Sequence, residues 1–501
     1  MEKEKHKFLN NIRNKSDSRW TDADELISSP SISSINIAAD DCATGGIPII
    51  SDGSTAYVDG SDTHTLVFGA TGAKKTRLIG MPLINILILS GESFIATDPK
   101  GELFERTSGV AEDKGYKTIV LDFRNLKNSD LWNPLALIYD YYHNGEKDEA
   151  IAMMNDLIRT MTEPQRQGAE DLYWVELGCA HALANLLFFI ETASQQEANL
   201  LNYANFCTAM SSPDGAEELS RYVADGSLAS INLKNVLTNK TAPKAFAGVA
   251  STITAMLRPF IIQKTLCQVL SGSSFELKDI GREKTAIYIV VPDEKTTLHF
   301  LVTTFIKQAY ESMIYNAQLE TTHSLPVRLN FVLDEFCNIP SIPDMTSMIS
   351  AGRSRNMRFF LFVQSLGQLR SMYGEDAETI KGNCENWVFL TSREQELLVE
   401  IHNLCGGTFL TSSYGTTSRH PLISISEMQR LRKEFGESLI LHGRNYPFIT
   451  QLPDIDDYAF KRLPPANRDS HALPGIYYYD VRQVIREIDG HERLLLFSSE
   501  E

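Results

Sequence analysis

The middle of the chain holds short motifs whose residue types suit phosphate chemistry. One apolar run, over residues 329–333, ends in two adjacent carboxylates, Asp334 and Glu335, and the next one, over residues 359–363, ends in Gln364. A carboxylate can hold Mg²⁺, a second can polarise an attacking water, and an amide can contact a terminal phosphate. The residue types and their order therefore predict a nucleotide-hydrolysing site.

Each of these residues receives a specific role under this interpretation. Asp334 holds Mg²⁺ through water, Glu335 activates the attacking water as a catalytic base, and Gln364 touches the γ-phosphate and reports its loss. Taken singly, each residue also fits an ordinary polar strand end that binds nothing.

An arginine cluster lies between the two runs. Arg353, Arg355 and Arg358 fit a solvated turn, which is the simpler interpretation. Alternatively, Arg353 is a catalytic arginine finger that reaches the γ-phosphate of a neighbouring subunit, so that hydrolysis depends on ring assembly. A finger acting in trans predicts that Arg353→Ala keeps nucleotide binding and loses turnover.

A phosphate cradle must accompany the acid pair, and one octapeptide is a candidate. After a predicted strand over residues 64–68, its members are Gly69, Ala70, Thr71, Gly72, Ala73, Lys74, Lys75 and Thr76. A strand, a Gly-rich turn and a following helix are the context that a P-loop requires. Lys75 would reach the β- and γ-phosphates, and the Thr76 hydroxyl would bind Mg²⁺.

Lys74 stands where such a loop normally has glycine. A side chain there can crowd the phosphates, and the backbone strain can cost on the order of 1 kcal/mol or more. Against this, a second ammonium adds positive charge beside an anionic ligand. The octapeptide alone also fits a Gly/Lys turn that binds no ligand.

The bulk composition is that of a folded protein with several domains. The chain has 501 residues, 43% hydrophobic and 22% charged residues, and a formal net charge of −17, which argues against uniform coating of nucleic acid. Seven cysteines are scattered without a CxxC pair, so we expect reduced thiols in a cytosolic protein. No signal peptide is evident, and the most apolar stretch, residues 78–89, is too short to span a bilayer.

The elements that must position these motifs can be predicted from apolar patterning. Nearly continuous apolar runs predict buried strands of a parallel α/β sheet at residues 64–68, 93–97, 118–123, 286–291, 329–333, 359–363, 387–390 and 439–441. Helical spacing predicts a helix from 151 that stops before Pro164, one over 174–190, and one over 245–257 stopped by Pro259.

These elements predict an all-α domain inserted into an α/β nucleotide-binding domain. The expected divisions are a polar N-terminal segment with at most one short helix, two parts of the nucleotide-binding domain around the helical one, and an acidic C-terminal tail with a short helix over 481–488. Their bounds are 1–50, 51–140, 141–278, 279–452 and 453–501.

Several further motifs give the chain a resemblance to a known family. The motifs are residues 97–103 (TDPKGEL), 131–135 (LWNPL), 333–340 (LDEFCNIP), Arg353, 363–365 (VQS), and 421–423 (PLI) with Glu427 and Leu431. Their order and spacing over residues 55–450 resemble the type IV secretion coupling proteins of the TraG/TraD type, the motor ATPases of bacterial conjugation.

The resemblance implies a RecA-like P-loop domain with an all-α domain, ATP and Mg²⁺ as cofactors, and a hexameric ring. It also implies coupling of a relaxase and single-stranded DNA to the type IV secretion channel by DNA translocation. Two departures are Lys74 in place of the P-loop glycine and no N-terminal transmembrane helices. We therefore expect a soluble cytoplasmic form that reaches the inner face of the membrane through partners, a separate membrane-anchor protein among them.

Two other functions stay open at this point. One is a non-hydrolysing module with a degenerate P-loop, which recruits relaxase or effector. The other is an FtsK/HerA-like pump for double-stranded DNA. The overall acidity fits any of these functions if contact with DNA is confined to a pore, and Lys234, Lys240 and Lys244 are the candidate basic residues.

Overall fold

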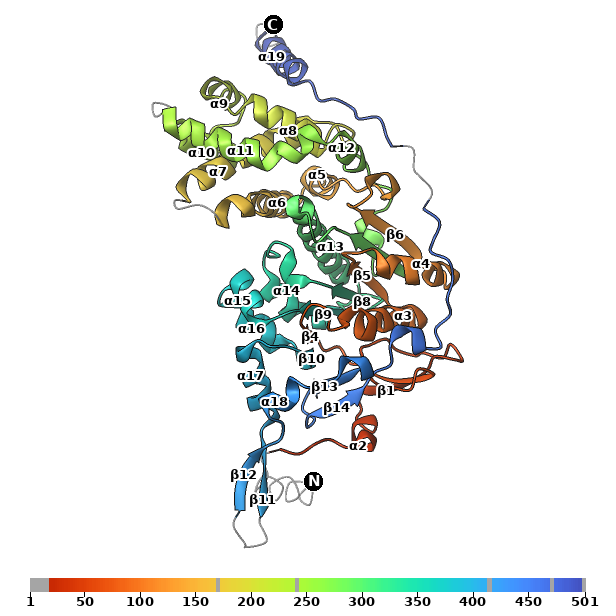
Figure 1. The fold of residues 1–501 in the computed structure, drawn as a ribbon. Helices are drawn as coiled ribbons and strands as arrows, with labels where there is room; N and C mark the ends of the chain where they lie inside the picture. The colour runs from red at the N-terminus through yellow and green to blue at the C-terminus, as the bar shows by residue number, and fades with distance from the viewer. Residues whose placement is uncertain (1–17, 168–171, 239–242, 412–416, 469–472, 498–501) are drawn as a thin grey trace. The chain divides into compact units, whose positions relative to one another are not determined.

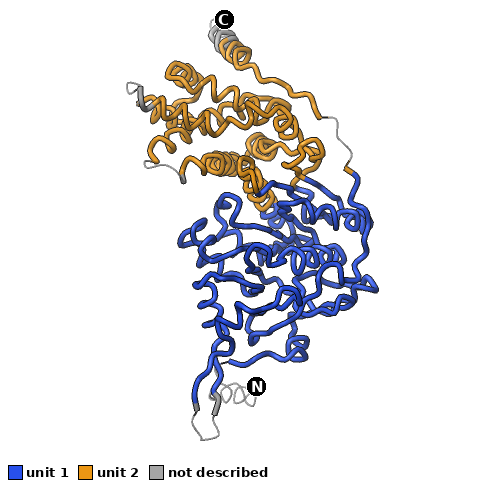
Figure 2. Tube along the Cα trace, in the orientation of Figure 1, with its two compact units in different colours: residues 1–120, 278–293, 313–467 blue, residues 121–277, 294–312, 468–501 orange. Residues whose placement is uncertain are grey.

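The computed structural model describes residues 18–167, 172–238, 243–411, 417–468 and 473–497. The chain divides into two compact units, shown in different colours in Figure 2. Unit 1 comprises Met1–Val120, Lys278–Asp293 and Met313–Asn467, and unit 2 comprises Leu121–Leu277, Glu294–Ser312 and Arg468–Glu501. Unit 2 begins at Leu121, within strand β6 (Lys117–Asp122), and its first α-helix, α5, begins at Ala136, whereas the all-α domain was expected from residue 141.

Unit 1 is built on a nine-stranded sheet with the order β14-β13-β10-β4-β9-β8-β5-β7-β6 (Figure 1). The strands are β4 (Thr65–Gly69), β5 (Ser93–Thr97), β6 (Lys117–Asp122), β7 (Thr285–Val290), β8 (Leu329–Leu333), β9 (Met357–Val363), β10 (Asn386–Thr391), β13 (Glu437–His442) and β14 (Phe448–Gln451). Neighbouring strands from β10 to β7 pair in parallel, and β13 and β14 add an antiparallel edge. The carboxyl ends of the parallel strands therefore lie along one edge of the sheet.

The eight predicted strands are all present in this sheet. They could be predicted because buried strands have nearly continuous apolar sequences. Every residue of β4, β5, β7, β8 and β9 is buried, as expected for strands covered on both faces. Strand β14 was not predicted, because it lies at the sheet edge and two of its four residues are exposed.

Helices connect the strands of unit 1. They are α3 (Met81–Ser90), α4 (Glu102–Asp113), α14 (Met345–Gly352), α15 (Leu366–Tyr373), α16 (Asp376–Asn383), α17 (Gln395–Cys405) and α18 (Ile425–Met428), with α13 (His299–Leu319) passing from unit 2 into unit 1. The main core is a cluster of buried hydrophobic residues from the sheet and its helices, with members from Leu26 to Ala466 along the chain. The P-loop helix begins with a π-helical turn, Thr76–Gly80, that continues directly into α3.

The N-terminal segment is more structured than its polar sequence predicts. It contains the expected short helix, α2 (Ala23–Ile27), but also β1 (Ile32–Asn36) and β2 (Pro48–Ser51), which flank β3 (Thr55–Asp59) in a small antiparallel sheet. Ile35 and Val58 are fully buried in this sheet. The few apolar residues of this sheet lie on one buried face. They are too widely spaced among serine and aspartate to predict strands from the sequence.

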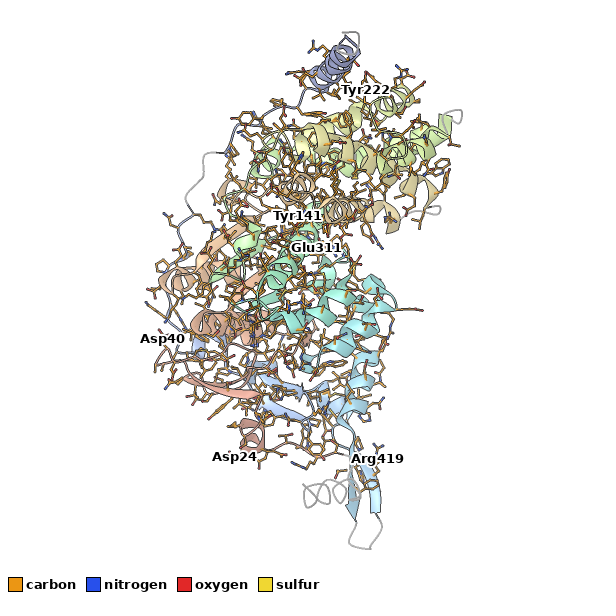
Figure 3. All side chains as sticks on the ribbon, turned by 180° about the vertical axis from the view of Figure 1, so that it is seen from behind. Asp24, Asp40, Tyr141, Tyr222, Glu311 and Arg419 are labelled. Carbon is orange, nitrogen blue, oxygen red and sulfur yellow. The ribbon has the colours of Figure 1, made fainter. Side chains whose placement is uncertain are left out.

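A second two-stranded sheet is formed by β11 (Gly407–Thr411) and β12 (Thr417–Pro421). Figure 3 labels Arg419 on this hairpin, opposite Phe409 in the register of the pair. The polar, threonine-rich sequence gave no strand prediction here.

The described part of unit 2 is helical apart from the last residues of β6. The helices are α5 (Ala136–His143), α6 (Lys147–Gln167), α7 (Tyr173–Thr192), α8 (Leu200–Ala209), α9 (Pro213–Ser220), α10 (Leu228–Leu237), α11 (Pro243–Ile262), α12 (Lys264–Val269) and α19 (Val481–Phe497). Helix α7 has the length and apolar character of a membrane span, but 72% of its most apolar window is buried within the protein. Helix α7 is therefore a longer apolar segment than residues 78–89, and most of it is buried as a core helix of unit 2.

Two predicted helix ends are wrong. Helix α6 continues past Pro164 and α11 past Pro259, although proline removes one hydrogen bond from a helix interior. Helix α11 packs on α7 and α8, and this tertiary packing outweighs the lost bond.

The C-terminal stretch is also more ordered than the predicted tail. Residues up to 467 belong to unit 1, where the backbone N–H of Ala466 donates to the Ser108 hydroxyl at 2.9 Å. The predicted helix over 481–488 is α19, which extends to Phe497. Tyr479 packs edge-on against Phe189 of unit 2, so aromatic residues rather than acidic ones hold this segment.

Candidate nucleotide site

The sheet topology brings the phosphate cradle and the acid pair to the same edge. Strand β4 leads into the octapeptide, and its neighbour β9 leads into Gln364. Strand β8, which ends before Asp334, is the next strand along. Parallel pairing from β4 through β9 to β8 therefore places three predicted motifs side by side.

Direct contacts join the two segments that are distant in the chain. The Thr76 hydroxyl donates to a carboxylate oxygen of Asp334 at 2.9 Å across 258 residues of sequence. The Thr97 hydroxyl, at the end of β5, donates to the Asp334 backbone carbonyl at 2.8 Å and fixes that turn. The two predicted magnesium ligands thus lie within hydrogen-bond distance of each other.

Glu335 is held by residues from both other motifs. Its Oε1 lies 3.5 Å from the ammonium of Lys75, and its Oε2 accepts a hydrogen bond from the Gln364 amide at 2.7 Å. The Gln364 carbonyl in turn accepts from the Thr71 hydroxyl at 3.3 Å. Gln364 therefore bridges the predicted base and the cradle, and its predicted contact with the γ-phosphate stays a prediction.

The cradle has the backbone of a phosphate loop, including at the unusual lysine. Gly72 has φ +76° with open space around an added Cβ, and Lys74 has φ +63°. A non-glycine residue in this left-handed region costs on the order of 1–2 kcal/mol. The Lys74 ammonium lies 3.5 Å from a carboxylate oxygen of Asp454, while the Lys75 ammonium donates to the Gly69 carbonyl at 2.7 Å.

Burial makes the acidic groups at this edge hard to ionise. Burial raises the pKa of Asp334 above its usual value and the Glu335 charge adds to the rise, whereas Lys75 and the Thr76 hydroxyl oppose it. Burial also raises the pKa of Asp98, which follows β5, to about 6, against the opposing hydrogen bonds of backbone N–H groups. A bound cation would favour the ionised form of both carboxylates.

The structure does not bring Arg353 to this site. It precedes β9, at the amino end of the strands, where it pairs with Asp62 at 2.9 Å and Glu385 at 2.6 Å. Arg353 therefore does not contact the cradle of its own subunit, and its predicted role as a finger on a neighbouring subunit's nucleotide stays a prediction. The interpretation of Arg358 as part of a solvated turn is wrong, because it is fully buried in β9 and paired with Glu92 at 2.5 Å.

Sequence reasoning missed three residues that lie at the cradle. Asp454 pairs with Lys74, Lys433 donates to the Gly72 carbonyl at 3.2 Å, and Asp98 lies close enough to Asp334 for their charges to interact. Asp98 was visible as part of the motif at 97–103. The other two follow β12 and β14 in regions with no motif of their own.

These residues fit a nucleotide with Mg²⁺. The Lys75 side chain is 6% exposed, and Thr76 and Asp334 offer the hard oxygen ligands that Mg²⁺ prefers. Residues from Gly69 to Thr76 would hold the phosphates, and Thr76 with Asp334 would hold the metal. Within the octapeptide, only Lys74 departs from the usual phosphate-loop sequence, and its ammonium forms an ion pair with Asp454.

Unit 2 holds a cavity of about 530 Å³ between α6, α7 and α10. Its lining includes Arg159, Arg166 and Glu176, and Arg166 pairs with Glu176 at 2.5 Å. Lys234, a candidate for DNA contact, is exposed and lies 3.2 Å from Asp225. Lys240 and the side chain of Lys244 lie outside the described residues.

The fold and the site define a RecA-like P-loop domain that carries an all-α domain. Residues 19–431 match the family model described as "Type IV secretory system Conjugative DNA transfer", and the chain belongs to this family. The predicted family is thereby confirmed.

Curated relatives are similar over most of this chain. The conjugal transfer protein TraG of Rhizobium radiobacter is 23% identical over 406 residues, covering 77% of this chain and 61% of the relative. The protein VirD4 of the same species is 24% identical over 442 residues, covering 81% and 59%. The chain thus spans about three fifths of the length of these relatives.

Solved structures support the fold. The unbound bacterial conjugative coupling protein TrwB superposes with a TM-score of 0.62 at 14% identity, covering 84% of this chain and 90% of TrwB. TrwB in complex with a non-hydrolysable ATP analogue gives 0.62 at 13% identity, covering 91% and 97%. At this identity the likeness concerns the fold alone, and it confirms the predicted architecture.

Proposed function

We propose that this protein binds ATP with Mg²⁺ and acts as the coupling motor of a conjugative type IV secretion system. The observation that carries the proposal is the contact of Thr76 with Asp334 beside Lys75 and Glu335. In the motor, the chain recruits a relaxase bound to single-stranded DNA and drives the strand toward the secretion channel. Family membership supports this proposal, as do the TrwB structures in complex with a non-hydrolysable ATP analogue and with ADP and Mg²⁺.

In the proposed motor, each residue of the site has a specific role. Backbone N–H groups from Gly72 to Thr76 and the Lys75 ammonium bind the phosphates, since both present positive charge to an anion. Glu335 accepts a proton from the attacking water on its carboxylate, and such general-base catalysis contributes about 10²–10⁴-fold. Gln364 orients Glu335 through the hydrogen bond at 2.7 Å. Bound Mg²⁺ would supply charge neutralisation at the phosphates.

A hexameric ring gives Arg353 its function in the proposed motor. Arg353 lies at the amino end of the strands, opposite the cradle, where a neighbouring subunit's nucleotide could meet it in a head-to-tail ring. Secretion channel components and a separate membrane-anchor protein are the proposed partners at the inner face of the membrane. The proposed location of the chain is therefore cytoplasmic, with recruitment to the membrane.

ATPase turnover with and without single-stranded DNA tests the motor. Wild-type protein is expected to hydrolyse ATP faster with DNA, and Lys75→Ala is expected to abolish this turnover. Lys461→Ala is the matched control, because Lys461 is an exposed lysine of the same unit paired with Asp113 at 2.8 Å. Absence of turnover in the wild type under all conditions would refute the motor.

A recruitment module that does not hydrolyse ATP is the second candidate. Lys74 in the cradle and the 530 Å³ cavity of unit 2 favour it, because a cavity lined by charged residues can bind a partner segment without any turnover. DNA-stimulated hydrolysis that depends on Lys75 excludes this candidate. A strict preference for double-stranded DNA in the same assay would instead favour an FtsK/HerA-like pump.

A further inference from the structure

A turn that follows the last strand of the sheet reaches the phosphate loop from outside. Residues 452–457, here called the C-terminal turn, come directly after β14. Asp454 of this turn accepts a hydrogen bond from Arg77 Nε at 3.0 Å and lies 3.5 Å from the Lys74 ammonium. The turn thus places a carboxylate beside the one residue of the loop that departs from the usual pattern.

Asp454 is well suited to hold a cation. Its side chain is 19% exposed, and the Arg77 guanidinium keeps the pKa of this carboxyl below its usual value although burial acts in the opposite direction. The backbone N–H of Asp456 also donates to Asp454, at 3.3 Å. Asp454 is therefore an ionised carboxylate of fixed orientation at neutral pH.

Lys74 needs such a partner because of its neighbour in the loop. Lys74 and Lys75 are adjacent, and both carry flexible stems of four carbons that can reach a bound anion. Lys75 lies inside the loop, 6% exposed, and Lys74 lies at its outer side, 35% exposed. A free Lys74 ammonium could swing into the cradle and compete with Lys75 for the same phosphate oxygens.

We propose that Asp454 is a positioning residue that holds the Lys74 ammonium outside the phosphate cradle, so that Lys75 alone faces the bound phosphate. The inference rests on the proposed function, since it assigns the cradle to a nucleotide. It explains how this chain tolerates lysine where a phosphate loop normally has glycine: the side chain has its own acidic partner, supplied by a segment far along the chain.

The same turn provides matched control positions. Asp456 pairs with Arg77 and Arg106 but has no ion pair with Lys74 among those of the described residues. Asp457 is an exposed carboxylate of the same turn. Asp456→Asn therefore tests loss of the Arg77 pair, and Asp457→Asn tests loss of a nearby charge.

Site-specific amine labelling read by mass spectrometry tests the proposal directly. The full-length protein is acylated with and without ADP and Mg²⁺, after equilibrium binding of a fluorescent ADP analogue has shown that the site is filled. Lys74, 35% exposed, is the reporter, because Lys75 is already shielded at 6% exposure. In the wild type, nucleotide is expected to leave the labelling of Lys74 unchanged. In Asp454→Asn, nucleotide is expected to protect Lys74, whereas Asp456→Asn and Asp457→Asn keep the wild-type pattern.

Steady-state kinetics adds a second readout. Asp454→Asn is expected to lower kcat about tenfold without raising KM, as for non-productive binding, and adding Lys74→Gly is expected to restore kcat. If Asp454→Asn still lowers kcat when Lys74 has been replaced by glycine, Asp454 does not act through Lys74 and the proposal is overturned.

The labelling result separates the two levels of inference. Failure of the wild type to bind the ADP analogue refutes the proposed function and the role of Asp454 with it. Binding accompanied by protection of Lys74 in the wild type refutes the role of Asp454 alone, and this outcome needs no variant that might fold poorly. Binding without any new protection of Lys74 in Asp454→Asn refutes it equally.

Discussion

The buried arginine of β9 gives the sharpest prediction about stability. Arg358 is fully buried and donates to Glu92 at 2.5 Å, to the Asn330 side chain at 2.8 Å, and to the backbone carbonyl of Ser61 at 3.0 Å. Arg358→Met removes these donors and leaves the Glu92 carboxylate buried with less compensation. Removing one partner of a buried ion pair typically costs about 3–5 kcal/mol.

The other contacts of Glu92 determine how much stability Arg358→Met loses within this range of about 3–5 kcal/mol. Glu92 keeps a second cation, Arg328, at 3.6 Å and the backbone N–H of Gly45 at 2.9 Å. We therefore expect the lower end, a loss of about 3 kcal/mol in the free energy of unfolding of unit 1. The double variant Arg358→Met, Glu92→Met should lose less than the sum of the two single variants, with a coupling energy of about 1–3 kcal/mol.

Urea unfolding followed by tryptophan fluorescence measures this loss. Trp132 and Trp174 belong to unit 2, so both are replaced by phenylalanine and the remaining Trp20 and Trp387 report on unit 1. The control is Arg353→Met, because Arg353 is 45% exposed and its ion pairs are on the surface.

An exposed ion pair contributes at most about 1 kcal/mol, so the control should lose little stability. Equal losses for the two arginine variants, or additivity of the Arg358 and Glu92 substitutions, would refute the reasoning.

Three further predictions concern the site. Folding raises the pKa of Asp98 to about 6, so protonation of Asp98 stabilises the folded state; this stabilisation is complete below about pH 4 and is lost as the pH rises through 6. In urea titrations, the stability of Asp98→Asn relative to the wild type should therefore grow by about 2–3 kcal/mol from pH 4 to pH 7. A difference in stability that stays constant with pH would contradict the pKa shift. Arg353→Ala should bind nucleotide but lose turnover by about 10³-fold or more, and mixing it with Glu335→Gln should restore part of the activity; no restoration would exclude a finger in trans. Gln364→Ala should lower kcat by about tenfold with little change in nucleotide affinity, and an equal rise in Kd would show that Gln364 acts in binding instead.

The sheet and the main site could be predicted because their signals are local. Strand β8 is a nearly continuous apolar run that ends just before Asp334, and such a run is typical of a strand covered on both faces in a parallel sheet. The cradle carries its own signature from Gly69 to Thr76. Parallel strands then place both motifs at the same edge, so their meeting follows from the fold.

The features that could not be predicted depend on residues that are distant in the chain or on sparse apolar patterns. Arg358 looks like a member of a surface cluster until β9 pairs with its neighbours and Glu92, 266 residues away, meets it in the interior. From the sequence, Lys74 is only a departure from the usual phosphate loop, because its ion-pair partner Asp454 lies in the distant segment after β14. The small sheet of β1 to β3 has too few apolar residues to reveal itself by periodicity.

A crystal structure of the protein with ADP and Mg²⁺ would show whether the two motifs form one nucleotide site. The account predicts the β-phosphate on the backbone of residues 72–76 with the Lys75 ammonium against it, and Mg²⁺ at about 2.1 Å from the Thr76 hydroxyl with Asp334 in its surrounding shell. Nucleotide bound at another place, or a Thr76–Asp334 hydrogen bond left intact beside an empty cradle at saturating ADP, would contradict it.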